Sequence, residues 1–421
     1  MSAESNDSRL GNDEDTSRQK DAHRSVQSAP HIWRARILWD NVAKVVVIHA
    51  LALTGILLAP RAMWPTWPWF CFMYICSALG VTAGAHRLWT HRSYKAKWPL
   101  EVLLMCFNSI SMQEDILEWS HDHRVHHKYS ETDADPHNAK RGFFFAHMGW
   151  LMLEKHPEVY KRRDETDVSD LRNNPIVAFQ RRHYAAMCIV FSVLVPTLVP
   201  WYLWGENVYV AFFVAFGLRY ALTLHQTWLV NSAAHLWGGR PYDKTINPSE
   251  NTAVCVIAIG EGFHNYHHTF PYDYSTSEWG PKLNITTAFI DLCAALGLAY
   301  DRKQASQDAI DGMRKRKGNM SSAGDESRSN ARRAVRPREA DWDGLLGQHT
   351  VDPYASKLWQ GSRAKSPTPM PSQSPHTVPV LHNSEGLSSD FVAITGWMKS
   401  IATQGGRTAL PCKGTGILTM L

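Results

Sequence analysis

Hydrophobic residues along this chain gather in four long runs that are separated by polar sequence. The runs cover approximately residues 42–60, 66–85, 184–204 and 207–229. Each run approaches the ~20 apolar residues that a helix needs to cross a bilayer. Tryptophans stand at their ends, where an indole suits the boundary between lipid and water: Trp64, Trp67, Trp201 and Trp204. The pattern therefore predicts four transmembrane helices.

Two shorter apolar segments, 99–113 and 284–300, carry the acidic residues Glu101 and Asp291. We expect them to form amphipathic helices that lie at the membrane surface or dip into it. The predicted fold class is therefore all-α, an integral membrane protein whose four transmembrane helices carry a helical cap.

The two ends of the chain are polar and predict disorder. Residues 1–30 are rich in Ser, Asp, Asn and Glu and form the predicted leader. No apolar stretch begins before about Val42, so we expect no cleaved signal peptide. Residues 306–421 contain Arg/Lys runs and a Ser/Pro-rich stretch near 365–380, which predict a mostly disordered tail. The membrane domain is expected to cover residues 31–305.

Positive charge indicates the orientation. Residues 86–182 carry fifteen Lys or Arg, whereas the connections near 61–65 and 205–206 hold only Arg61. Positive loops stay in the cytosol, so both termini and the long middle loop are expected to be cytosolic. The net charge of +5 is small and no nucleic-acid recognition motif is present, so nucleic-acid binding is not expected.

Cysteine does not indicate a metal site or a disulfide framework. The chain has seven, mostly in apolar surroundings, and they are expected to be reduced thiols: Cys71, Cys76, Cys106, Cys188, Cys255, Cys293 and Cys412.

The candidate chemistry lies in clusters of histidine. They are His86-Arg-Leu-Trp-Thr-His91, His123-Arg-Val-His126-His127, Asn231-Ser-Ala-Ala-His235 and His264-Asn-Tyr-His267-His268. Because residues at i, i+3 and i+4 share a helix face, each His-x-x-His-His unit is expected to project three imidazoles toward one point. His86 and His91 lie about 140° apart on an ideal helix, so they converge only if the helix ends or unwinds between them.

All the clustered histidines fall on the predicted cytosolic side, so they are able to meet. Isolated histidines are more often ordinary polar residues with satisfied hydrogen bonds, and we interpret His49, His147, His156 and His183 in that way.

Nine imidazoles exceed the three or four ligands of one zinc ion. They favour two metals with open coordination and redox-active iron, although the ligand type alone does not exclude zinc. The candidate ligands are histidines and not the carboxylate-rich set of the carboxylate-bridged di-iron bundle, so that bundle is not the expected site. A nitrogen-rich iron pair at a membrane surface suits activation of dioxygen and attack on an unactivated C–H bond.

These motifs resemble the three histidine boxes of animal stearoyl-CoA (delta-9 acyl-CoA) desaturases, members of the membrane fatty acid desaturase family. The resemblance covers about residues 34–305. It includes Asp133-Ala-Asp135-Pro-His137-Asn, Pro196-Thr-Leu-Val-Pro200-Trp-Tyr, Trp228-Leu-Val-Asn231 and Ala299-Tyr300-Asp301-Arg302-Lys303.

The resemblance implies a di-iron centre (two Fe²⁺) in the cytosolic cap, and no flavin, haem or nicotinamide bound by this chain. The implied ligands are His86, His91, His123, His126, His127, His235, His264, His267 and His268, with Asn231 reaching a metal through water. The implied reaction places a cis double bond at carbon 9 of palmitoyl- or stearoyl-CoA with dioxygen. The implied electron donor is cytochrome b5 with its NADH-dependent reductase, at the endoplasmic reticulum membrane.

The resemblance also implies substrate contacts. A bent acyl tunnel would have its kink at Gln113, Trp119 and Thr227, and its closed end at Tyr74 and Ala78. The CoA headgroup would meet Asn41, Asp122, Lys155 and Trp228.

Three positions depart from the vertebrate relatives. His121 and Glu154 replace arginines, and Glu114 replaces an asparagine. Fewer cations weaken the attraction for a polyphosphate, so either other basic residues such as Arg162 or Arg163 compensate, or the acyl carrier or the substrate differs.

Basic residues on the cytosolic face (Lys95, Lys97, Arg302) are expected to meet either the acidic cytochrome or lipid headgroups. The alternatives for function are a desaturase of other regiospecificity or a fatty acyl or sphingolipid hydroxylase with similar histidine boxes. A non-catalytic membrane scaffold is a different class, and a zinc hydrolase is disfavoured because His-Glu-x-x-His is absent.

Overall fold

The computed structural model describes residues 33–318 of the chain. Within this part, four helical runs are long and apolar enough to cross a membrane: Trp39–Arg61, Thr66–Thr90, Pro175–Trp204 and Val208–Leu236. They coincide with the four runs predicted from hydropathy, so the all-α membrane fold is confirmed. The predicted leader and most of the predicted tail lie outside the described residues.

Each span is made of several helical segments. They are α2 (Trp39–Leu58) and η1 (Ala59–Arg61); α3 (Thr66–Leu79) and η2 (Gly80–Thr90); α9 (Pro175–Cys188), η5 (Ile189–Leu194) and α10 (Val195–Trp204); and α11 (Val208–Ala211), η6 (Phe212–Leu218), α12 (Arg219–Asn231) and α13 (Ala233–Leu236).

Short helices and one two-stranded antiparallel ribbon make up the remaining described elements. They are β1 (Lys95–Ala96), α4 (Trp98–Ser111), α5 (Ile116–Tyr129), η3 (Ala139–Arg141), η4 (Phe145–Gly149), α6 (Trp150–Met152), α7 (Pro157–Asp164), α8 (Ser169–Arg172), α14 (Thr252–Ile257), α15 (His264–Thr269), α16 (Ile285–Ala295), β2 (Ala299–Tyr300) and α17 (Gln307–Lys317). In the ribbon Lys95 pairs with Tyr300 and Ala96 with Ala299.

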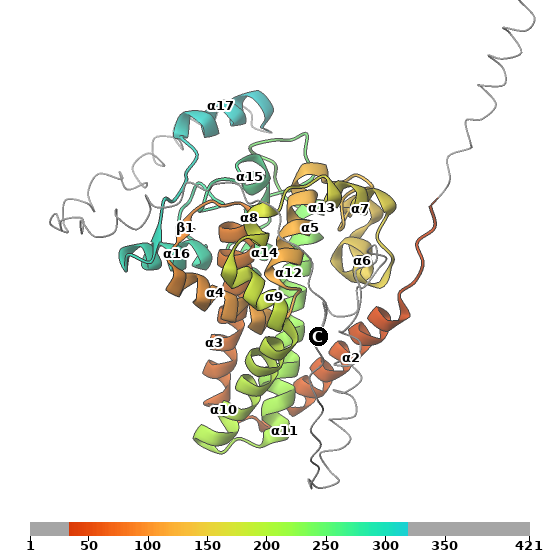
Figure 1. Cartoon of the computed structure of the whole chain (residues 1–421), viewed down its shortest axis with the longest axis vertical. Coiled ribbons are helices and arrows are strands. Elements are labelled where there is room, and N and C mark those ends of the chain that lie inside the picture. Colours follow the sequence, from red (N-terminus) through yellow and green to blue (C-terminus); the bar gives the residue numbers. More distant parts are fainter. Residues whose placement is uncertain (1–32, 319–421) are drawn as a thin grey trace, which may run out of the picture. The chain divides into compact units, whose positions relative to one another are not determined.

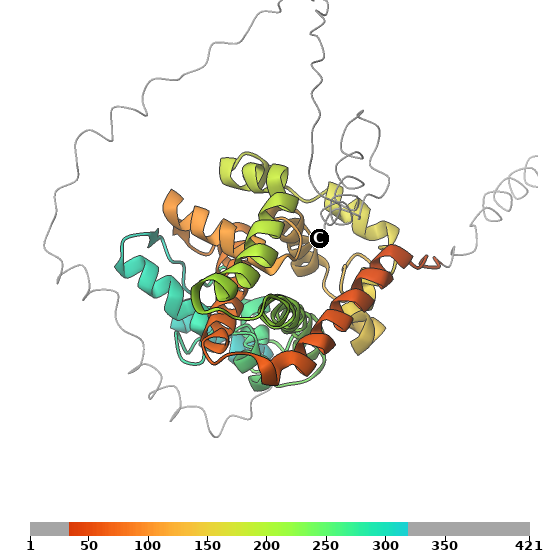
Figure 2. The same ribbon diagram turned by 90° about the horizontal axis from the view of Figure 1, so that it is seen from below.

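The spans and the cap occupy opposite ends of the described part. Figure 1 shows α3, α10 and α11 in its lower half, and α5, α13, α15 and α17 above them. Seen from below, α2 runs obliquely along one side of the other spans (Figure 2). Only 17% of its most apolar window is buried, as expected for a helix that faces lipid.

Three segments within the spans, η2, η5 and η6, are π-helical. Such segments leave backbone carbonyls that need partners, because the bilayer core offers none. Arg219, which is fully buried, donates to the carbonyls of Ile110 and Ser192, both at 3.0 Å. This buried cation therefore satisfies one carbonyl of the π-helical η5 and one in the last turn of α4.

A buried carboxylate joins the two turns at the end of the spans away from the cap. Glu206 accepts hydrogen bonds from Met63 N at 2.8 Å, Thr66 Oγ1 at 2.5 Å and Asn207 N at 3.0 Å. The connection between spans one and two is thereby tied to the connection between spans three and four.

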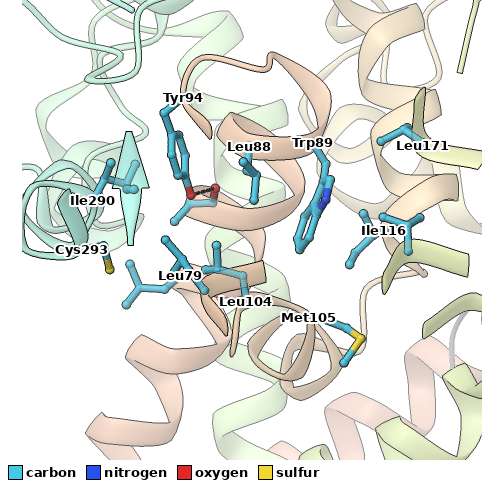
Figure 3. Close-up of a cluster of buried hydrophobic side chains, with 14 of the residues drawn as sticks. Leu79, Leu88, Trp89, Tyr94, Leu104, Met105, Ile116, Leu171, Ile290 and Cys293 are labelled. Carbon is cyan, nitrogen blue, oxygen red and sulfur yellow. Dashed lines mark hydrogen bonds between the residues drawn. The ribbon is translucent and has the colours of Figure 1, made fainter. Parts of the chain in front are cut away.

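The core beneath the cap fixes where η2 ends. Leu79, Leu88 and Trp89 pack with Leu104 of α4 and Ile116 of α5 (Figure 3). The Tyr94 hydroxyl donates to Ala83 O at 2.9 Å (Figure 3). Helix α4, expected to lie at the membrane surface, buries one face in this core.

The folded part continues beyond the boundary at 305 that the sequence analysis expected. Helix α17 places Ile310, which is fully buried, in a cluster with Tyr242 and Tyr266. Arg314 forms an ion pair with Glu278 at 2.6 Å in which both side chains are buried. The basic run at the start of the predicted tail therefore belongs to a packed helix.

Packing between α3 and α4 depends on Gly80. A Cβ at this position would lie 2.1 Å from Asn108 N and 2.2 Å from Phe107 C, and both are backbone atoms.

Because these backbone atoms cannot easily move away, we expect Gly80→Ala to reduce the free energy of unfolding by about 1–3 kcal/mol. Gly239 has no atom within 4 Å of such a Cβ, so Gly239→Ala should change stability by less than about 0.5 kcal/mol. Thermal unfolding in detergent, followed by fluorescence, compares the two; equal effects would contradict the packing argument.

Candidate functional site

Nine histidine side chains form two neighbouring groups in the cap. The first contains His86, His91, His123, His127 and His267, and the second contains His126, His235, His264 and His268. Within each group the candidate ligand atoms all lie within 4.8 Å of one another. The two groups touch through the stacked rings of His127 and His268, whose centroids are 4.1 Å apart.

A π-helix brings together His86 and His91, the two histidines of the first motif, which would lie about 140° apart on an ideal α-helix. His91 N donates to His86 O at 3.1 Å, an i→i+5 bond. In such a helix, residues five apart lie one above the other, and the two rings are 4.8 Å apart. The sequence analysis required the helix to end or unwind between these residues, and the structure shows a π-helix, which has more residues per turn than an α-helix, ending at Thr90.

The two His-x-x-His-His units do not each point to one site, which corrects the sequence-based expectation. On α5, His123 and His127 join the first group while His126 joins the second. On α15, His267 joins the first group while His264 and His268 join the second. Successive helical residues point about 100° apart, so each unit contributes to both groups and holds them side by side.

Buried carboxylates contact the histidines on the side away from the converging nitrogens. Glu261 lies 3.0 Å from Nδ1 of His86, and Glu131 lies 2.6 Å from Nδ1 of His235. Asp135 lies 2.8 Å from Nδ1 of His126. Such outer partners fix the tautomer and the ring orientation of metal-binding histidine and leave Nε2 free to bind.

Two of these carboxylates are themselves held in place. Arg87, which is fully buried, donates to Glu261 Oε1 at 2.6 Å. Although burial alone would raise it, the pKa of Glu261 is lowered to about 2 by Arg87 and His86. Glu131 adopts a positive φ of 56°, which is unusual for a residue with a side chain, and its N–H donates to Asp135 Oδ2 at 2.9 Å.

Burial keeps most of these imidazoles neutral. It lowers the pKa well below the ordinary value for six of them, with the neighbouring imidazoles adding to the effect: His91, His123, His127, His264, His267 and His268. A neutral imidazole has a free lone pair. Nε2 of His91 is buried without a protein partner among the described residues. The donor set therefore fits a pair of transition-metal ions.

A third set of possible ligands, His126, Asp135 and His137, is part of this outer layer. Nδ1 of His126 is occupied by Asp135, and His137 N also donates to Asp135 at 3.0 Å. The set therefore supports the second group and is not a separate metal site.

A cavity of about 40 Å³ opens beside the histidine groups. Its lining contains two predicted metal residues, His123 and Asn231, together with five of the nine predicted substrate residues: Gln113, Trp119, Asp122, Thr227 and Trp228. The cavity is far smaller than the ~300–1,000 Å³ of small-molecule pockets, so substrate entry requires the side chains around it to move.

Two of the residues predicted to line the kink, Gln113 and Thr227, bind the same carbonyl. Gln113 Nε2 donates to Thr223 O at 3.3 Å, and Thr227 Oγ1 donates to the same carbonyl at 3.4 Å. Trp119 stacks on His123 with ring centroids 4.7 Å apart. The cavity wall nearest the histidines is therefore fixed from two sides.

The other predicted substrate residues lie outside this lining. Asn41 donates to Leu151 O at 2.8 Å, and Tyr74 O–H donates to Ile257 O at 3.1 Å. Ala78 is buried in the hydrophobic cluster that also contains Leu79 and Leu104. Lys155 lines a neighbouring cavity of about 450 Å³ together with Glu154.

The mouth of the small cavity carries interleaved charges. Asp122 forms ion pairs with both Lys155 and Arg163, and Arg163 also pairs with Glu118. Burial alone would raise the pKa of Glu118, but Arg163 and Arg181 lower it to about 2.

Two of the positions that depart from the vertebrate relatives, His121 and Glu114, also lie at this mouth. Nε2 of His121 lies 2.8 Å from Arg163 O, which holds the end of α7 against α5. Glu114 lines the cavity, and burial raises the pKa of its carboxyl.

Of the two arginines that the sequence analysis considered, only Arg163 reaches this mouth. Arg162 forms ion pairs with Glu165 at 2.7 Å and with Glu158 at 3.6 Å.

Residues 62–277 match the family model described as fatty acid desaturase. The chain belongs to this family. It is 58% identical over 275 residues to an acyl-CoA desaturase of Cyprinus carpio, covering 65% of this chain and 84% of that protein. It is 56% identical over 284 residues to an acyl-CoA desaturase of Ovis aries, and 55% identical over 285 residues to the stearoyl-CoA desaturase of Homo sapiens. Each of these covers 68% of this chain and 79% of the relative. The family inferred from the histidine motifs is thereby confirmed.

Sequence reasoning missed the supporting carboxylates and one histidine. Glu131 and Glu261 stand in no motif of their own, although Glu261 is three residues before His264. His225 lies between Thr223 and Thr227 on α12 and was not singled out. The only available signal was polar residues within apolar or histidine-rich segments.

Loss of an outer carboxylate should weaken metal binding. We expect Glu131→Gln to reduce metal affinity about 10–100-fold, because Nδ1 of His235 loses its anionic partner. Metal retention during titration with a chelator measures this. Glu165→Gln, which removes an exposed carboxylate paired with Arg162, is the matched control. Equal retention by both variants would contradict the role of Glu131.

Proposed function

We propose that this chain is an acyl-CoA delta-9 desaturase. Two hydrogens leave adjacent CH2 groups of a saturated long-chain acyl-CoA such as palmitoyl- or stearoyl-CoA. Dioxygen is reduced to two waters with two electrons and two protons. The observation that carries the proposal is the pair of buried and half-buried imidazole groups beside a cavity lined by His123 and Asn231, in a member of the fatty acid desaturase family.

Two iron ions suit this donor set, because neutral imidazoles with open positions accept redox-active iron. The nine histidines would hold the ions, and Asn231 would reach one through water. When bound, iron supplies the activation of dioxygen and the removal of hydrogen from an unactivated C–H bond. The protein buries the ligands and excludes bulk water.

The cavity wall would select the carbon that reacts. Gln113 and Thr227 share the anchor at Thr223, and Trp119 lies against His123. A rigid bend at this point would hold one C–C bond next to the metals in a cis-like geometry. Tyr74 and Ala78 are proposed to close the tunnel at its far end.

Arg163 is proposed to compensate for the two missing arginines. It approaches Asp122 from α7, beside Lys155, whereas His121 contributes only a contact to the Arg163 carbonyl. The phosphates of CoA would then compete with Asp122 and Glu118 for these two cations.

The electrons are proposed to come from cytochrome b5 and its NADH-dependent reductase, with the cap and both termini on the cytosolic side of the endoplasmic reticulum membrane. Of the basic residues suggested for this contact, Lys95 pairs with Asp301 at 2.9 Å and Arg302 with Asp291 at 2.6 Å. Their charge is therefore partly neutralised, which favours a weak and transient contact.

The direct test is expression in yeast that lacks its own delta-9 desaturase, with double bonds located by mass spectrometry. Growth without added unsaturated fatty acid, with double bonds at carbon 9, is the expected result. Double bonds at other carbons would contradict the proposed regiochemistry and indicate a desaturase of other regiospecificity. Hydroxylated products would contradict the proposed reaction and indicate a hydroxylase. No product from a well-expressed, iron-loaded chain would contradict the proposed function.

The role of Arg163 predicts a difference between neighbouring arginines. Arg163→Ser should raise KM for acyl-CoA about tenfold with little change in kcat, since each lost charge-assisted contact contributes about 1.5 kcal/mol. Arg162→Ser should leave KM unchanged, because its side chain pairs with Glu165. Steady-state kinetics at two salt concentrations measures both variants. An unchanged KM in Arg163→Ser would remove the residue from the carrier site.

The tunnel end predicts a change in chain length. Ala78→Leu should shift preference toward shorter acyl chains, because the distance from the metals to the closed end falls. Ala43→Leu, on the exposed side of α2, is the control. Competition between palmitoyl- and stearoyl-CoA gives the ratio, and an unchanged ratio would reject the tunnel-end assignment.

A further inference from the structure

Trp150 stands between the two cavities of the cap. It is the first residue of α6. Among the described residues, it alone lines both the small cavity beside the histidine groups and the larger cavity of about 450 Å³. The larger cavity has the size of an ordinary small-molecule site, which is about 300–1,000 Å³. A ligand that extends from one cavity into the other therefore passes Trp150.

Predicted contacts of the acyl carrier lie on both sides of this indole. Asp122 and Trp228 line the small cavity, and Lys155 lines the larger one. Asp122 and Lys155 also form an ion pair with each other. A carrier that meets all three residues therefore crosses the boundary at which Trp150 stands.

The indole N–H of Trp150 has no hydrogen-bond acceptor among residues 33–318, although Nε1 is buried. By contrast, Nε1 of Trp204 donates to Thr66 Oγ1 at 3.0 Å. Nε1 of Trp89 is also buried and unpaired, but Trp89 lines neither cavity and lies in a hydrophobic cluster. A buried donor without a partner is uncommon and calls for an explanation. For Trp150, a ligand in the adjoining cavities can supply the acceptor.

A small rotation of this indole costs no hydrogen bond, because its N–H makes none. The small cavity measures about 40 Å³, so substrate entry already requires the side chains around it to move. Rotation of the indole as the cavity opens would join the two cavities and bring the N–H to their boundary.

The position of Trp150 is tied to the second histidine group. The ring of His137 lies edge-on to the indole, with centroids 4.5 Å apart and planes at 88°. His137 N donates to Asp135 Oδ1 at 3.0 Å, and the same oxygen lies 2.8 Å from Nδ1 of His126. A ligand atom bound by Trp150 is therefore held at a restricted distance from the histidine groups.

The chemistry of acyl-CoA identifies the acceptor. A saturated acyl chain carries no hydrogen-bond acceptor, and the phosphates are expected at the cations Lys155 and Arg163. Between the acyl chain and the phosphates lie the thioester carbonyl and the two amide carbonyls of pantetheine. Each of these carbonyl oxygens can accept an indole N–H.

We propose that Trp150 is a substrate-binding residue whose indole N–H donates to a carbonyl oxygen in the arm that joins the acyl chain to the nucleotide of acyl-CoA. The inference rests on the proposed function and adds a residue to the predicted carrier site. Held at this point, the arm limits how far the acyl chain reaches past the histidine groups. Trp150 thereby contributes to the choice of the carbon that lies beside the metals.

The test is calorimetric binding of stearoyl-CoA to the iron-loaded chain without an electron donor, so that no turnover occurs. Trp150→Phe keeps an aromatic ring and removes the N–H. We expect its Kd to be about three- to tenfold higher than that of the wild type, as for the loss of one neutral hydrogen bond. Trp98→Phe is the control, because Trp98 is 72% exposed at the start of α4. Its Kd should match that of the wild type.

A thioether analogue distinguishes the two kinds of acceptor. S-octadecyl-CoA lacks the thioester carbonyl and keeps the pantetheine amides. If Trp150 binds the thioester carbonyl, the wild type and Trp150→Phe should bind the analogue equally. If it binds an amide carbonyl, the difference in Kd should remain. Each result, together with weaker binding of stearoyl-CoA by Trp150→Phe, supports the proposal and assigns the acceptor.

Two further variants guard against a loss of fold. Trp150→His returns a ring N–H and should bind stearoyl-CoA more tightly than Trp150→Phe. Trp150→Met, which also lacks the N–H, takes the place of Trp150→Phe if that variant does not fold. Equal Kd values for stearoyl-CoA in the wild type and the variant without the N–H would overturn the role of Trp150 alone. A wild type that does not bind stearoyl-CoA would overturn the proposed function as well.

Discussion

Hydrogen bonds between buried carboxylates and the Nδ1 atoms of histidines are the interaction on which the cap depends. Without them, imidazoles gathered in a buried space would be free to rotate and to change tautomer. Glu261, Glu131 and Asp135 each fix one ring and thereby direct its Nε2 inward. Other residues in turn hold these carboxylates in position, as Arg87 does by donating to Glu261.

The irregular helices follow from the same requirement. A regular α-helix would separate His86 from His91, whereas the π-helical η2 stacks them at 4.8 Å. Widened helices carry a cost in backbone hydrogen bonding, and the core of Trp89, Leu104 and Ile116 holds this one in place. The membrane domain is thus a rigid support for the cap. The ends of spans two and four that are nearest the cap place their histidines close together.

Much of this arrangement could be predicted from the sequence, because hydropathy and histidine spacing are local signals. The four spans and the grouping of the histidines followed from them. The division of each His-x-x-His-His unit between two groups could not be predicted, since it depends on how α5 and α15 face each other. Glu131 carried no local signal, because its role comes from a contact with His235, 104 residues away. The fold of α17 was also missed, since a basic run indicates packing only when its partner, here Glu278, is known.

The charges at the cavity mouth bear on the proposed recognition of the acyl carrier. Three positions that the family resemblance assigns to carrier recognition are altered, and Arg163 of α7, which we propose as the compensating residue, forms an ion pair with Asp122. Whether a substitution weakens a site therefore depends on which side chain reaches the same point in space, and sequence position alone does not give that answer.

The central claim is that two imidazole groups hold two iron ions. Its most direct test is the metal content of the purified, catalytically active chain, measured by elemental analysis together with protein concentration. The account predicts two iron per chain, with activity that falls in proportion as iron is removed. One zinc per chain in fully active protein, with no dependence on iron, would contradict it.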